Sequence, residues 1–354
     1  MRHALALARR GLGRVAPNPA VGCVIVGAGR IVGRGWTQPG GRPHAETEAL
    51  RQAGPAAKGA TAFVTLEPCA HQGETPPCAD ALVAAGVTRV VGAIEDPDSR
   101  VEGRGFAKLR EAGVEVLTGV LSEEATNLNA GFFLRIREGR PHVTLKIAQS
   151  LDGETASPGP DKWITGPEAR RFGHLLRAQT DAILIGSESA LADDPELTCR
   201  IPGLEGRSPL RVILDTRGRL GADSKIARTA KDISTVVFTA DPKALSRLTK
   251  SGIEVCSSQR DSQGHIDISA MLQTLAKRGV TRLLVEGGPT VQSSFLHAGL
   301  ADRVELFTAP VFLRAQHGNA ARTTVNTDLE AMEFARESRR LLGTDLLESF
   351  ARKA

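Results

Sequence analysis

Three side chains that can bind a metal lie close together in the sequence, next to an acid. His44 and Glu46 are two residues apart, and Cys69 and Cys78 enclose eight residues. One imidazole and two thiolates supply three of the four ligands of a tetrahedral zinc ion, which leaves the fourth position open for water. An open position is typical of a catalytic zinc site, whereas a structural site is closed by four protein ligands.

The acid completes a hydrolytic arrangement. In zinc deaminases a metal-activated water attacks an aminated ring carbon, and a glutamate that is not a ligand carries the protons. The sequence therefore predicts hydrolytic deamination, with His44, Cys69 and Cys78 as zinc ligands and Glu46 as the catalytic residue.

Two simpler interpretations explain less. The cysteines and the histidine could be unrelated core residues, since free cysteine is often buried, but Glu46 and the flanking prolines would then be coincidental. A structural zinc site would need a fourth ligand, for which His71 is the nearest candidate, and it would leave Glu46 without a role.

The composition is that of an ordinary globular protein of two or three domains. The 354 residues are 41% hydrophobic and 24% charged, and no apolar run approaches the roughly 20 residues of a membrane span. The N-terminal segment reads as a short basic amphipathic helix without a signal-peptide core, so we expect a cytoplasmic protein. Five widely spaced cysteines, an odd number, argue against a disulfide framework.

The charge balance indicates a small anionic ligand. A net charge of +5 suits a phosphorylated substrate, but the 45 basic residues are mixed with 40 acidic ones. Tyrosine is absent and aromatic residues make up 4% of the chain, so a stacking surface for single-stranded nucleic acid is not expected. We therefore expect a phosphorylated small molecule as partner, with no nucleic acid and no membrane.

Short apolar runs alternate with helical patterns in the first part of the chain, which predicts a layered α/β domain. Two of the helices begin at predicted metal ligands, where the helix N-terminus favours thiolates. A polar helix over Leu121–Glu138 and the turn Gly139-Arg140-Pro141 mark a boundary between domains 1–141 and 142–354. The predicted strands are Val21–Val26, Arg30–Trp36, Ala60–Leu66, Arg89–Ile94 and Val114–Leu117, and the other predicted helices are His44–Ala53, Cys78–Ala85 and Gly105–Ala112.

The second domain repeats the α/β alternation. Glu286–Thr290, with two glycines, lies between a strand and a helix, where backbone N–H groups favour a phosphate. An ordinary turn explains these residues equally well, and their spacing differs from a Rossmann site. Leu191–Thr198 could likewise hold hydroxyl groups of a sugar or cofactor, or be a solvated turn. The predicted strands are Val143–Ala148, Ala182–Gly186, Arg211–Asp215, Thr235–Thr239, Arg282–Glu286 and Arg303–Ala309, and the helices are Pro167–Ala178, Ala244–Ser251, Ile268–Arg278 and Thr290–Ala298.

Together these motifs resemble the bifunctional deaminase/reductase family of riboflavin biosynthesis over essentially the whole chain. The eight residues between the cysteines strengthen the resemblance, because many other zinc deaminases have two there. The resemblance implies a cytidine-deaminase-like three-layer domain followed by a dihydrofolate-reductase-like α/β domain. The segments that carry it are Pro17–Gly22, Pro43–Glu46, Thr65–Cys78, Ser150–Gly153, Trp163–Thr165, Leu191–Thr198 and Glu286–Thr290.

The resemblance implies two successive reactions. The zinc domain removes an amino group from a diaminopyrimidinone ribosylamino 5′-phosphate by hydrolysis, and the second domain reduces the ribosyl group to ribityl with NADPH. Asn18 is expected to bind the pyrimidine. The substrate contacts implied for the reductase are Asp161, Arg177, Leu197, Arg200 and Glu286, and the cofactor contacts are Gln149, Trp163, Ser189, Asp193, Thr216, Gly288, Pro289, Thr290, Val291, Gln292, Ser293 and Ser294.

Some of these residues have a more specific expectation. Arg177 and Arg200 would hold the ribose phosphate, and Trp163 would pack on the cofactor. A glycine at position 288 would meet any need for a positive φ in the loop. Lys146 is near the expected site, although an exposed position at a strand end is the commoner explanation.

Three positions depart from the family pattern. Glu74 stands where relatives usually carry Lys or Arg, which concerns phosphate recognition by its loop. Asp98-Ser99 replaces the more usual Asn-Pro at the deaminase pocket. Asp161 stands where Ser is common and adds a negative charge near a phosphate.

Two other functions stay open on the sequence alone. One is a single-function zinc base or nucleoside deaminase whose second domain binds a nucleotide. The other is a zinc-stabilised RNA-binding module, which would need a fourth zinc ligand and a concentrated basic face. The sequence also leaves open the oligomeric state, a homo-oligomer included, and the choice of NADPH over NADH.

Overall fold

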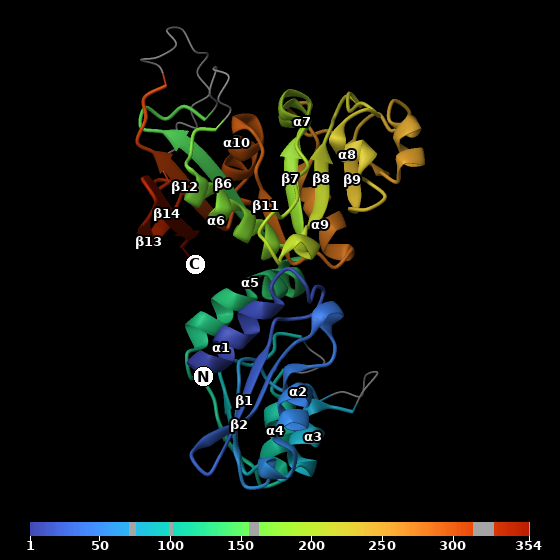
Figure 1. Ribbon diagram of the computed structural model, residues 1–354. Helices are drawn as coiled ribbons and strands as arrows, with labels where there is room; N and C mark the ends of the chain where they lie inside the picture. The colour runs from blue at the N-terminus through green and yellow to red at the C-terminus, as the bar shows by residue number, and fades with distance from the viewer. Residues whose placement is uncertain (71–75, 99–101, 156–162, 314–328, 354) are drawn as a thin grey trace. The chain divides into compact units, whose positions relative to one another are not determined.

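The computed structural model describes residues 1–70, 76–98, 102–155, 163–313 and 329–353 (Figure 1). The chain divides into two compact units, Met1–Arg140 and Pro141–Ala354, each with its own sheet and hydrophobic core. Within the described ranges, no helix is long and apolar enough to cross a bilayer. Four residues named above lie outside these ranges: His71, Glu74, Ser99 and Asp161.

The first unit is built on a five-stranded sheet of order β2-β1-β3-β4-β5. β1 pairs antiparallel with β2 and β3, whereas β3, β4 and β5 run parallel. The predicted strands and helices of this unit are confirmed to within two residues at each end. The strands are β1 Gly22–Gly27, β2 Arg30–Trp36, β3 Thr61–Val64, β4 Arg89–Gly92 and β5 Glu115–Leu117, and the helices are α1 Arg2–Ala8, α2 Ala45–Ala53, α3 Cys78–Ala84, α4 Arg104–Glu111 and α5 Ser122–Glu138.

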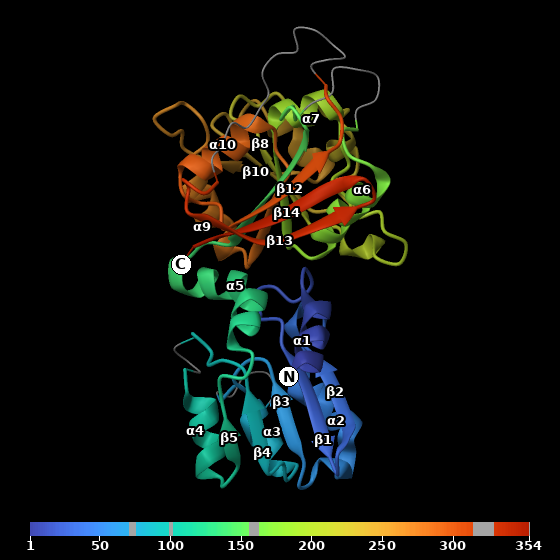
Figure 2. The ribbon, with the colours of Figure 1, turned by 90° about the vertical axis from the view of Figure 1, so that its left-hand side faces the viewer.

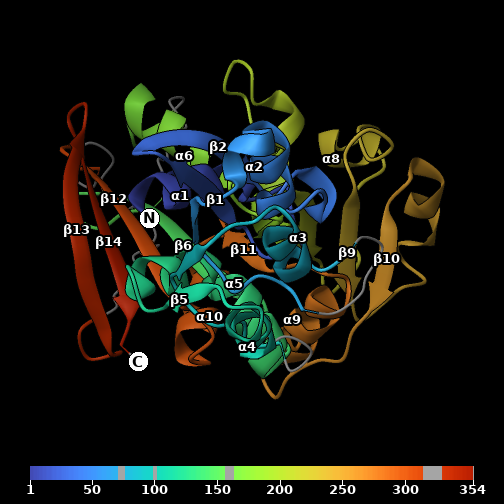
Figure 3. The same ribbon diagram turned by 90° about the horizontal axis from the view of Figure 1, so that it is seen from below.

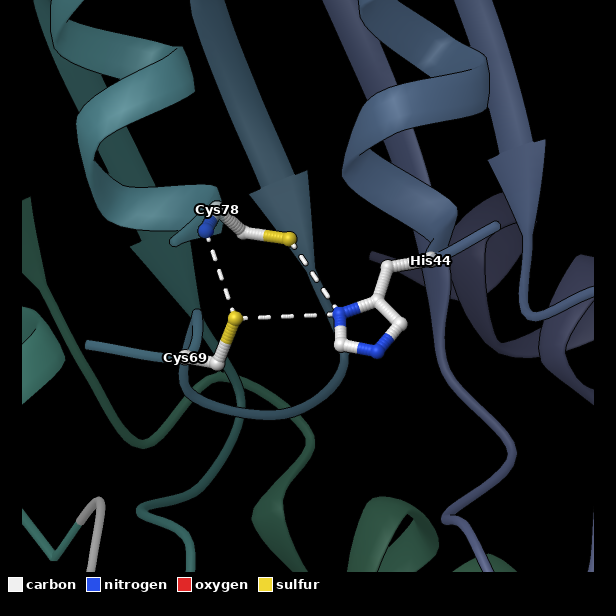
Figure 4. A group of neighbouring side chains, drawn as sticks. All are labelled: His44, Cys69 and Cys78. Carbon is white, nitrogen blue, oxygen red and sulfur yellow. Dashed lines mark hydrogen bonds between the residues drawn. The ribbon is translucent and has the colours of Figure 1, made fainter. Parts of the chain in front are cut away.

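Alternate residues of β1 face opposite sides of this sheet, as the pleat of a strand requires. Cys23 and Ile25 pack in the core that includes α2, α3 and α4, whereas Val24 packs against α1. Figure 1 shows α2, α3 and α4 on one face of the sheet and α1 and α5 on the other. The resulting three layers bring the N-termini of α2 and α3 side by side (Figure 4).

The second unit contains a nine-stranded sheet of order β10-β9-β8-β7-β11-β6-β12-β14-β13. The first seven strands in this order run parallel, and β14 and β13 complete the sheet antiparallel. Figure 3 shows β10 and β13 at its opposite edges. The strands are β6 His142–Ser150, β7 Ala182–Gly186, β8 Leu210–Leu214, β9 Thr235–Thr239, β10 Glu254–Ser257, β11 Arg282–Val285, β12 Arg303–Ala309, β13 Phe334–Leu342 and β14 Asp345–Arg352.

Helices cover both faces of this sheet, which buries the parallel strands on both sides. Leu275 of α9 and Phe295 of α10 pack on one face, and Ile226 of α8 packs on the other. Figure 2 shows α9 and α10 on the side opposite α6. Because parallel strands end at the same edge, the turns after β7, β8 and β11 lie together. The helices are α6 Pro167–Ala178, α7 Ser187–Asp193, α8 Lys225–Arg228, α9 Ile268–Lys277 and α10 Pro289–His297.

Two predicted elements of this unit differ in the structure. The helix expected over Ala244–Ser251 is a 3-10 helix over Ser246–Ser251, where serine and threonine hydroxyls bond nearby carbonyls and compete with an α-helix. The turn expected over Leu191–Thr198 begins inside α7, and Asp194 ends that helix with a left-handed φ of 41°. The strands β10, β13 and β14 were not predicted.

Candidate active sites

The three predicted zinc ligands meet at the N-termini of two helices. His44 immediately precedes α2, Cys78 is the first residue of α3, and Cys69 lies in the loop after β3. The His44 Nδ1 atom is 3.3 Å from the Cys78 sulfur and 3.7 Å from the Cys69 sulfur, and the three donor atoms lie within 4.8 Å of one another. Figure 4 shows Nδ1 directed between the two sulfurs.

This triangle has the dimensions of a tetrahedral zinc site. Zn–S bonds of ~2.3 Å and Zn–N bonds of ~2.0 Å at tetrahedral angles place nitrogen and sulfur about 3.5 Å apart. The two measured separations bracket that value. Hydrogen bonding with the Cys78 side chain lowers the pKa of Cys69 to about 4, and the Cys78 backbone N–H, which donates to the Cys69 sulfur over 3.2 Å, acts in the same direction. Hydrogen bonding with Cys69 and burial raise the pKa of Cys78 instead. The types of the three donors and their spacing fit zinc.

Glu46 lies beside the triangle without being one of its donors. It is in the first turn of α2, with 3% of its surface exposed. Burial raises the pKa of Glu46 to about 7. A carboxyl group with such a pKa both accepts and releases protons at neutral pH.

A second buried carboxylate, Glu67, anchors the loop that carries Cys69. Its Oε1 accepts hydrogen bonds from two N–H groups in the first turn of α4, over 2.7 and 3.1 Å. Its Oε2 accepts two more, from Asp96 and Gly103, over 3.1 and 2.9 Å. Four N–H donors, two of them at a helix N-terminus, stabilise this buried charge. A Cβ on Gly105 would overlap a carbonyl oxygen of the loop, so glycine is required for this close approach.

A cavity of about 310 Å³ opens beside the triangle. Asn18, His44, Glu46 and Cys69 all line it, so the structure brings the predicted pyrimidine contact to the metal ligands. Gly41, with a φ of 89°, lies so close to Asn18 that any Cβ there would overlap the Asn18 amide. Asp98, one of the departures from the family pattern, is buried and lines the same cavity.

In the second unit, Arg177, Arg200 and Glu286 line a cavity of about 440 Å³. Arg177 Nε donates to Oε1 of Glu286 over 2.7 Å, and Nη2 donates to Oε2 over 2.9 Å, which makes a bidentate ion pair. Although burial opposes ionisation, the Arg177 guanidinium lowers the pKa of Glu286 to about 2. Arg177 Nη1 also donates to the Thr198 carbonyl over 2.9 Å, which ties the loop before Arg200 to α6.

Lys146 lies in this cavity, and the expectation of an exposed position at a strand end is wrong. It is in the middle of β6, where the register of the parallel pair with β11 places it beside Glu286. Its Nζ is 5.6 Å from the centroid of the Phe307 ring. Burial lowers the pKa of Lys146, although the Glu286 charge opposes this shift. The cavity therefore combines a lysine that releases its proton more readily with a carboxylate that stays ionised.

Another cavity of the second unit, of about 570 Å³, lies at the edge where β7, β8 and β11 end. Gly288 precedes α10 with a φ of −67°, so the positive φ considered from the sequence is not required there. Glycine is needed at position 287 instead, because Val291 packs closely against its backbone and a Cβ there would lie 2.9 Å from the Cβ of Val291. Seven predicted cofactor contacts line this cavity: Ser189, Thr216, Gly288, Pro289, Thr290, Val291 and Ser294.

The charges of this cavity fit a ligand with phosphate groups. The N-terminus of α10 points its N–H groups to the cavity wall, and Arg217, Arg219 and Arg260 add positive charge. Arg219 Nη2 donates to Ser187 Oγ over 2.8 Å and to Glu188 Oε1 over 2.7 Å, which holds its guanidinium at the start of α7. NADPH, with three phosphate groups, is such a ligand.

The remaining predicted contacts lie elsewhere. Trp163 lines the cavity of Arg177 instead of the cofactor cavity, and the Arg170 guanidinium lies 5.1 Å from its ring centroid. Gln292 is buried, and its amide donates to the Lys146 carbonyl over 3.1 Å. The predicted contacts that line neither cavity of the second unit are Gln149, Asp193, Leu197, Gln292 and Ser293.

Several charged residues of these cavities were not identified from the sequence. Arg170 and His174 lie seven and three residues before the predicted contact Arg177 on α6, a helical spacing that places the three on one face and could have revealed the other two. His174 Nδ1 is 3.1 Å from the Thr198 carbonyl and 3.3 Å from the Arg200 nitrogen. The arginines of the cofactor cavity have no such helical signal, because Arg217 and Arg219 lie in the loop after β8 and Arg260 lies in the loop after β10.

Comparisons with known proteins agree with this division. Residues 1–94 match the cytidine and deoxycytidylate deaminase zinc-binding region, and residues 141–342 match the RibD C-terminal domain. Riboflavin biosynthesis protein RibD of Escherichia coli (strain K12) is 43% identical over 325 residues, with 88% of this chain and 87% of the relative covered. RibD of Aquifex aeolicus (strain VF5) is 39% identical over 353 residues, with 99% and 97% covered. The structure of Acinetobacter baumannii RibD, form 1, has a TM-score of 0.87 at 40% identity, with 100% and 98% covered.

The fold and the sites thus define a zinc deaminase joined to a reductase of the dihydrofolate-reductase type. The chain belongs to the RibD family of bifunctional riboflavin-biosynthesis enzymes. It is a deaminase and a reductase, it acts on a small phosphorylated pyrimidine, and its cofactors are zinc and NADPH. These findings favour the bifunctional enzyme over a single-function deaminase with a nucleotide-binding domain and over an RNA-binding module, because the second unit is a reductase domain of this family.

Proposed function

We propose that the first unit hydrolyses the amino group of a diaminopyrimidinone ribosylamino 5′-phosphate, with His44, Cys69 and Cys78 as zinc ligands. The observation that supports this most is the convergence of three donor atoms, at tetrahedral spacing, beside the buried acid Glu46. Zinc would supply Lewis-acid activation of a water molecule for attack on the aminated ring carbon.

Glu46 is the proton carrier of this reaction. It takes up a proton from the attacking water and delivers it to the leaving amine, so the carboxyl group returns to its starting form. Its burial keeps solvent from competing for that proton. Asn18, on the same cavity wall, presents an amide that can donate to and accept from the polar edge of a pyrimidine.

In the second unit, Arg177 and Arg200 hold the ribose phosphate. An arginine side chain has five N–H groups, and Arg177 uses three of them for Glu286 and Thr198. Two N–H groups are left for the substrate, while the three bonds fix the guanidinium in place. Arg200 is exposed at the cavity mouth and supplies a second positive charge.

Lys146 donates the proton that reduction requires. When a ribosyl group becomes ribityl, a hydride adds to the anomeric carbon, the bond to the ring oxygen breaks, and that oxygen takes a proton. NADPH supplies the hydride. A buried ammonium group with a lowered pKa releases a proton readily, and the ionised Glu286 beside it stabilises the ammonium form between turnovers.

The cofactor cavity selects NADPH through its arginines. The first turn of α10 would hold the pyrophosphate of a bound NADPH, and the glycines at positions 287 and 288 keep the backbone accessible. Arg217, Arg219 and Arg260 supply the positive charge that favours the additional 2′-phosphate of NADPH over NADH.

Incubation with the pyrimidine substrate, with and without NADPH, followed by mass analysis of the products tests both reactions. Deamination should occur without NADPH, and the mass increase of reduction should appear only with it. Glu46→Gln should keep about one zinc per chain and lose deamination by ~10²-fold or more. Full deaminase activity in that variant would remove Glu46 from the mechanism. A cytoplasmic location and a homo-oligomer stay predictions, to be tested by cell fractionation and light scattering.

A further inference from the structure

Two arginines line the deaminase cavity, and the roles assigned so far do not use them. Arg42 lies two residues before the metal ligand His44, and Arg135 lies in the last turns of α5. Both are half-buried. Among the described residues that line this cavity, they are the side chains with a permanent positive charge.

The face that α5 turns to the cavity is set by helical spacing. Phe132, Arg135 and Ile136 all line the cavity, and positions three and four residues apart share one face of a helix. Arg137, two residues after Arg135, points elsewhere: it is exposed, and its guanidinium lies 5.5 Å from the centroid of the Phe133 ring. Arg135 is therefore directed into the cavity by the register of α5, between two apolar residues.

The charge of the cavity calls for these arginines when the ligand is a phosphate ester. A phosphate monoester carries close to two negative charges at neutral pH. Four carboxyl groups also line the cavity, those of Glu46, Glu67, Asp96 and Asp98. Glu67 accepts four N–H donors, and Asp96 accepts the N–H of Asp98 over 2.9 Å, but carboxylates in a cavity wall still disfavour the binding of a further anion. An anionic group can bind here only close to a cation.

The ring end of the substrate is fixed by the zinc ligands and Glu46, so its phosphate must bind at another part of the cavity wall. A volume of about 310 Å³ is at the lower end of the range for small-molecule sites, so a pyrimidine ribosyl phosphate fills it and leaves little freedom. We propose that Arg42 and Arg135 bind the 5′-phosphate of the substrate in the deaminase unit and make deamination selective for the phosphorylated pyrimidine. This inference rests on the deaminase function proposed above.

The test compares deamination of the phosphorylated substrate and of its dephosphorylated form, measured as ammonia release without NADPH. Arg42→Ala and Arg135→Ala should each lower kcat/KM for the phosphorylated substrate by roughly 10- to 100-fold, as expected for loss of a hydrogen bond to a charged group. Their kcat/KM for the dephosphorylated form and their zinc content should stay unchanged. Arg137→Ala, on the same helix but outside the cavity, is the matched control and should behave like wild type.

Reduction of the already deaminated substrate by the same variants is an internal control, because it uses the second unit and should not change. An unchanged kcat/KM for the phosphorylated substrate in Arg42→Ala and Arg135→Ala overturns the proposal. An equal loss with both substrates at full zinc content also overturns it, since the arginines would then not recognise the phosphate. If an alanine variant loses zinc, the glutamine variant at that position is judged by the same criteria. If the wild type deaminates neither form, the proposed deaminase function itself is wrong and this inference falls with it.

Discussion

Replacement of Arg177 by methionine should destabilise the second unit, because it leaves the Glu286 carboxylate buried without its bidentate partner. The Arg177 and Glu286 side chains are only 15% and 11% exposed, so water solvates the carboxylate less well than the guanidinium does. The pKa of Glu286 falls from 4.5 to about 2 against the effect of burial. At 1.36 kcal/mol per pKa unit, this shift corresponds to roughly 3 kcal/mol at neutral pH. Removal of one partner of a buried pair typically costs a similar ~3–5 kcal/mol, and Lys146 supplies a part that the variant keeps.

The pH dependence has a definite sign. The pKa of Glu286 in the folded protein lies below its ordinary value, so the ion pair contributes its full stabilisation above about pH 4.5 and loses it as the pH falls toward 2. The difference in stability between wild type and Arg177→Met should therefore be constant from about pH 7 to pH 5 and should shrink toward pH 3.

Differential scanning calorimetry of the full chain measures this difference. A unit of this size changes its Tm by ~2–4 °C per kcal/mol, so the transition of the second unit should fall by about 6–12 °C at pH 7. Arg171→Met, at an exposed position of the same helix, is the matched control. Arg177→Met combined with Glu286→Gln should recover part of the loss, because no buried carboxylate remains. The reasoning is refuted if Arg177→Met and Arg171→Met melt within about 2 °C of each other at pH 7, or if their difference does not shrink in acid.

Three further changes test other parts of the chain. Gly287→Ala should raise the KM for NADPH several-fold, because the new Cβ displaces Val291. Gly206→Ala is the control and should not change the KM, because a Cβ at that position meets nothing within 4 Å. An unchanged KM in Gly287→Ala would contradict the assignment of this loop to the cofactor. Arg219→Ala should reduce the preference for NADPH over NADH by roughly tenfold in steady-state assays, and equal losses with both cofactors would argue against a 2′-phosphate contact. A fragment of residues 1–141 should be soluble and bind about one zinc per chain by metal analysis. Aggregation of the fragment, with a stable full chain, would mean that the two units depend on a shared interface.

The metal site could be predicted from the sequence because its geometry is mostly local. His44 and Cys78 each stand at the start of a helix, and Glu46 follows His44 within the first turn of that helix. Helix starts can be read from a sequence, and the positions of three of the four residues follow once the helices are placed. Only the position of Cys69 relative to the other two ligands depends on the tertiary structure. The eight residues between the cysteines already limit how far Cys69 can lie from Cys78.

The arginines and acids around that site could not be predicted in the same way. Glu67 was an ordinary acid in the sequence, and its role becomes visible only when α4 supplies two N–H groups to its carboxylate. Arg135 belongs to a polar helix with several charged residues. The sequence does not show which of these residues lines the deaminase cavity. The difference between Arg135 and Arg137 depends on the side of α5 that packs on the sheet.

Strands β13 and β14 were missed because the residues that they bury and expose do not alternate between apolar and polar types. Seven of the nine residues of β13 are exposed and four are charged, which removes the alternation expected of a strand. The buried face of β14 includes Asp345 and Ser349, and both find partners far away in the sequence. Asp345 accepts the N–H of Gly166 over 2.6 Å, and Ser349 donates to Glu305 over the same distance. A polar residue can face the core when such a partner exists, and the sequence does not display the pairing.

The reductase cavity is the case in which sheet order decides the chemistry. Along the chain, four strands lie between β6 and β11, namely β7, β8, β9 and β10. In the sheet, all four lie on the side of β11 that is away from β6. In space β11 lies between β6 and β7, with Val285 paired to Leu145. This insertion of a late strand next to the first one brings Glu286 to Lys146. The sequence pattern predicts β6, β7 and β11 but not which of them are neighbours, so Lys146 is interpreted as a surface residue until the order β7-β11-β6 is known. The proximity of Lys146 and Glu286 is therefore a property of topology, whereas the geometry of the three zinc-ligand candidates depends mostly on local motifs.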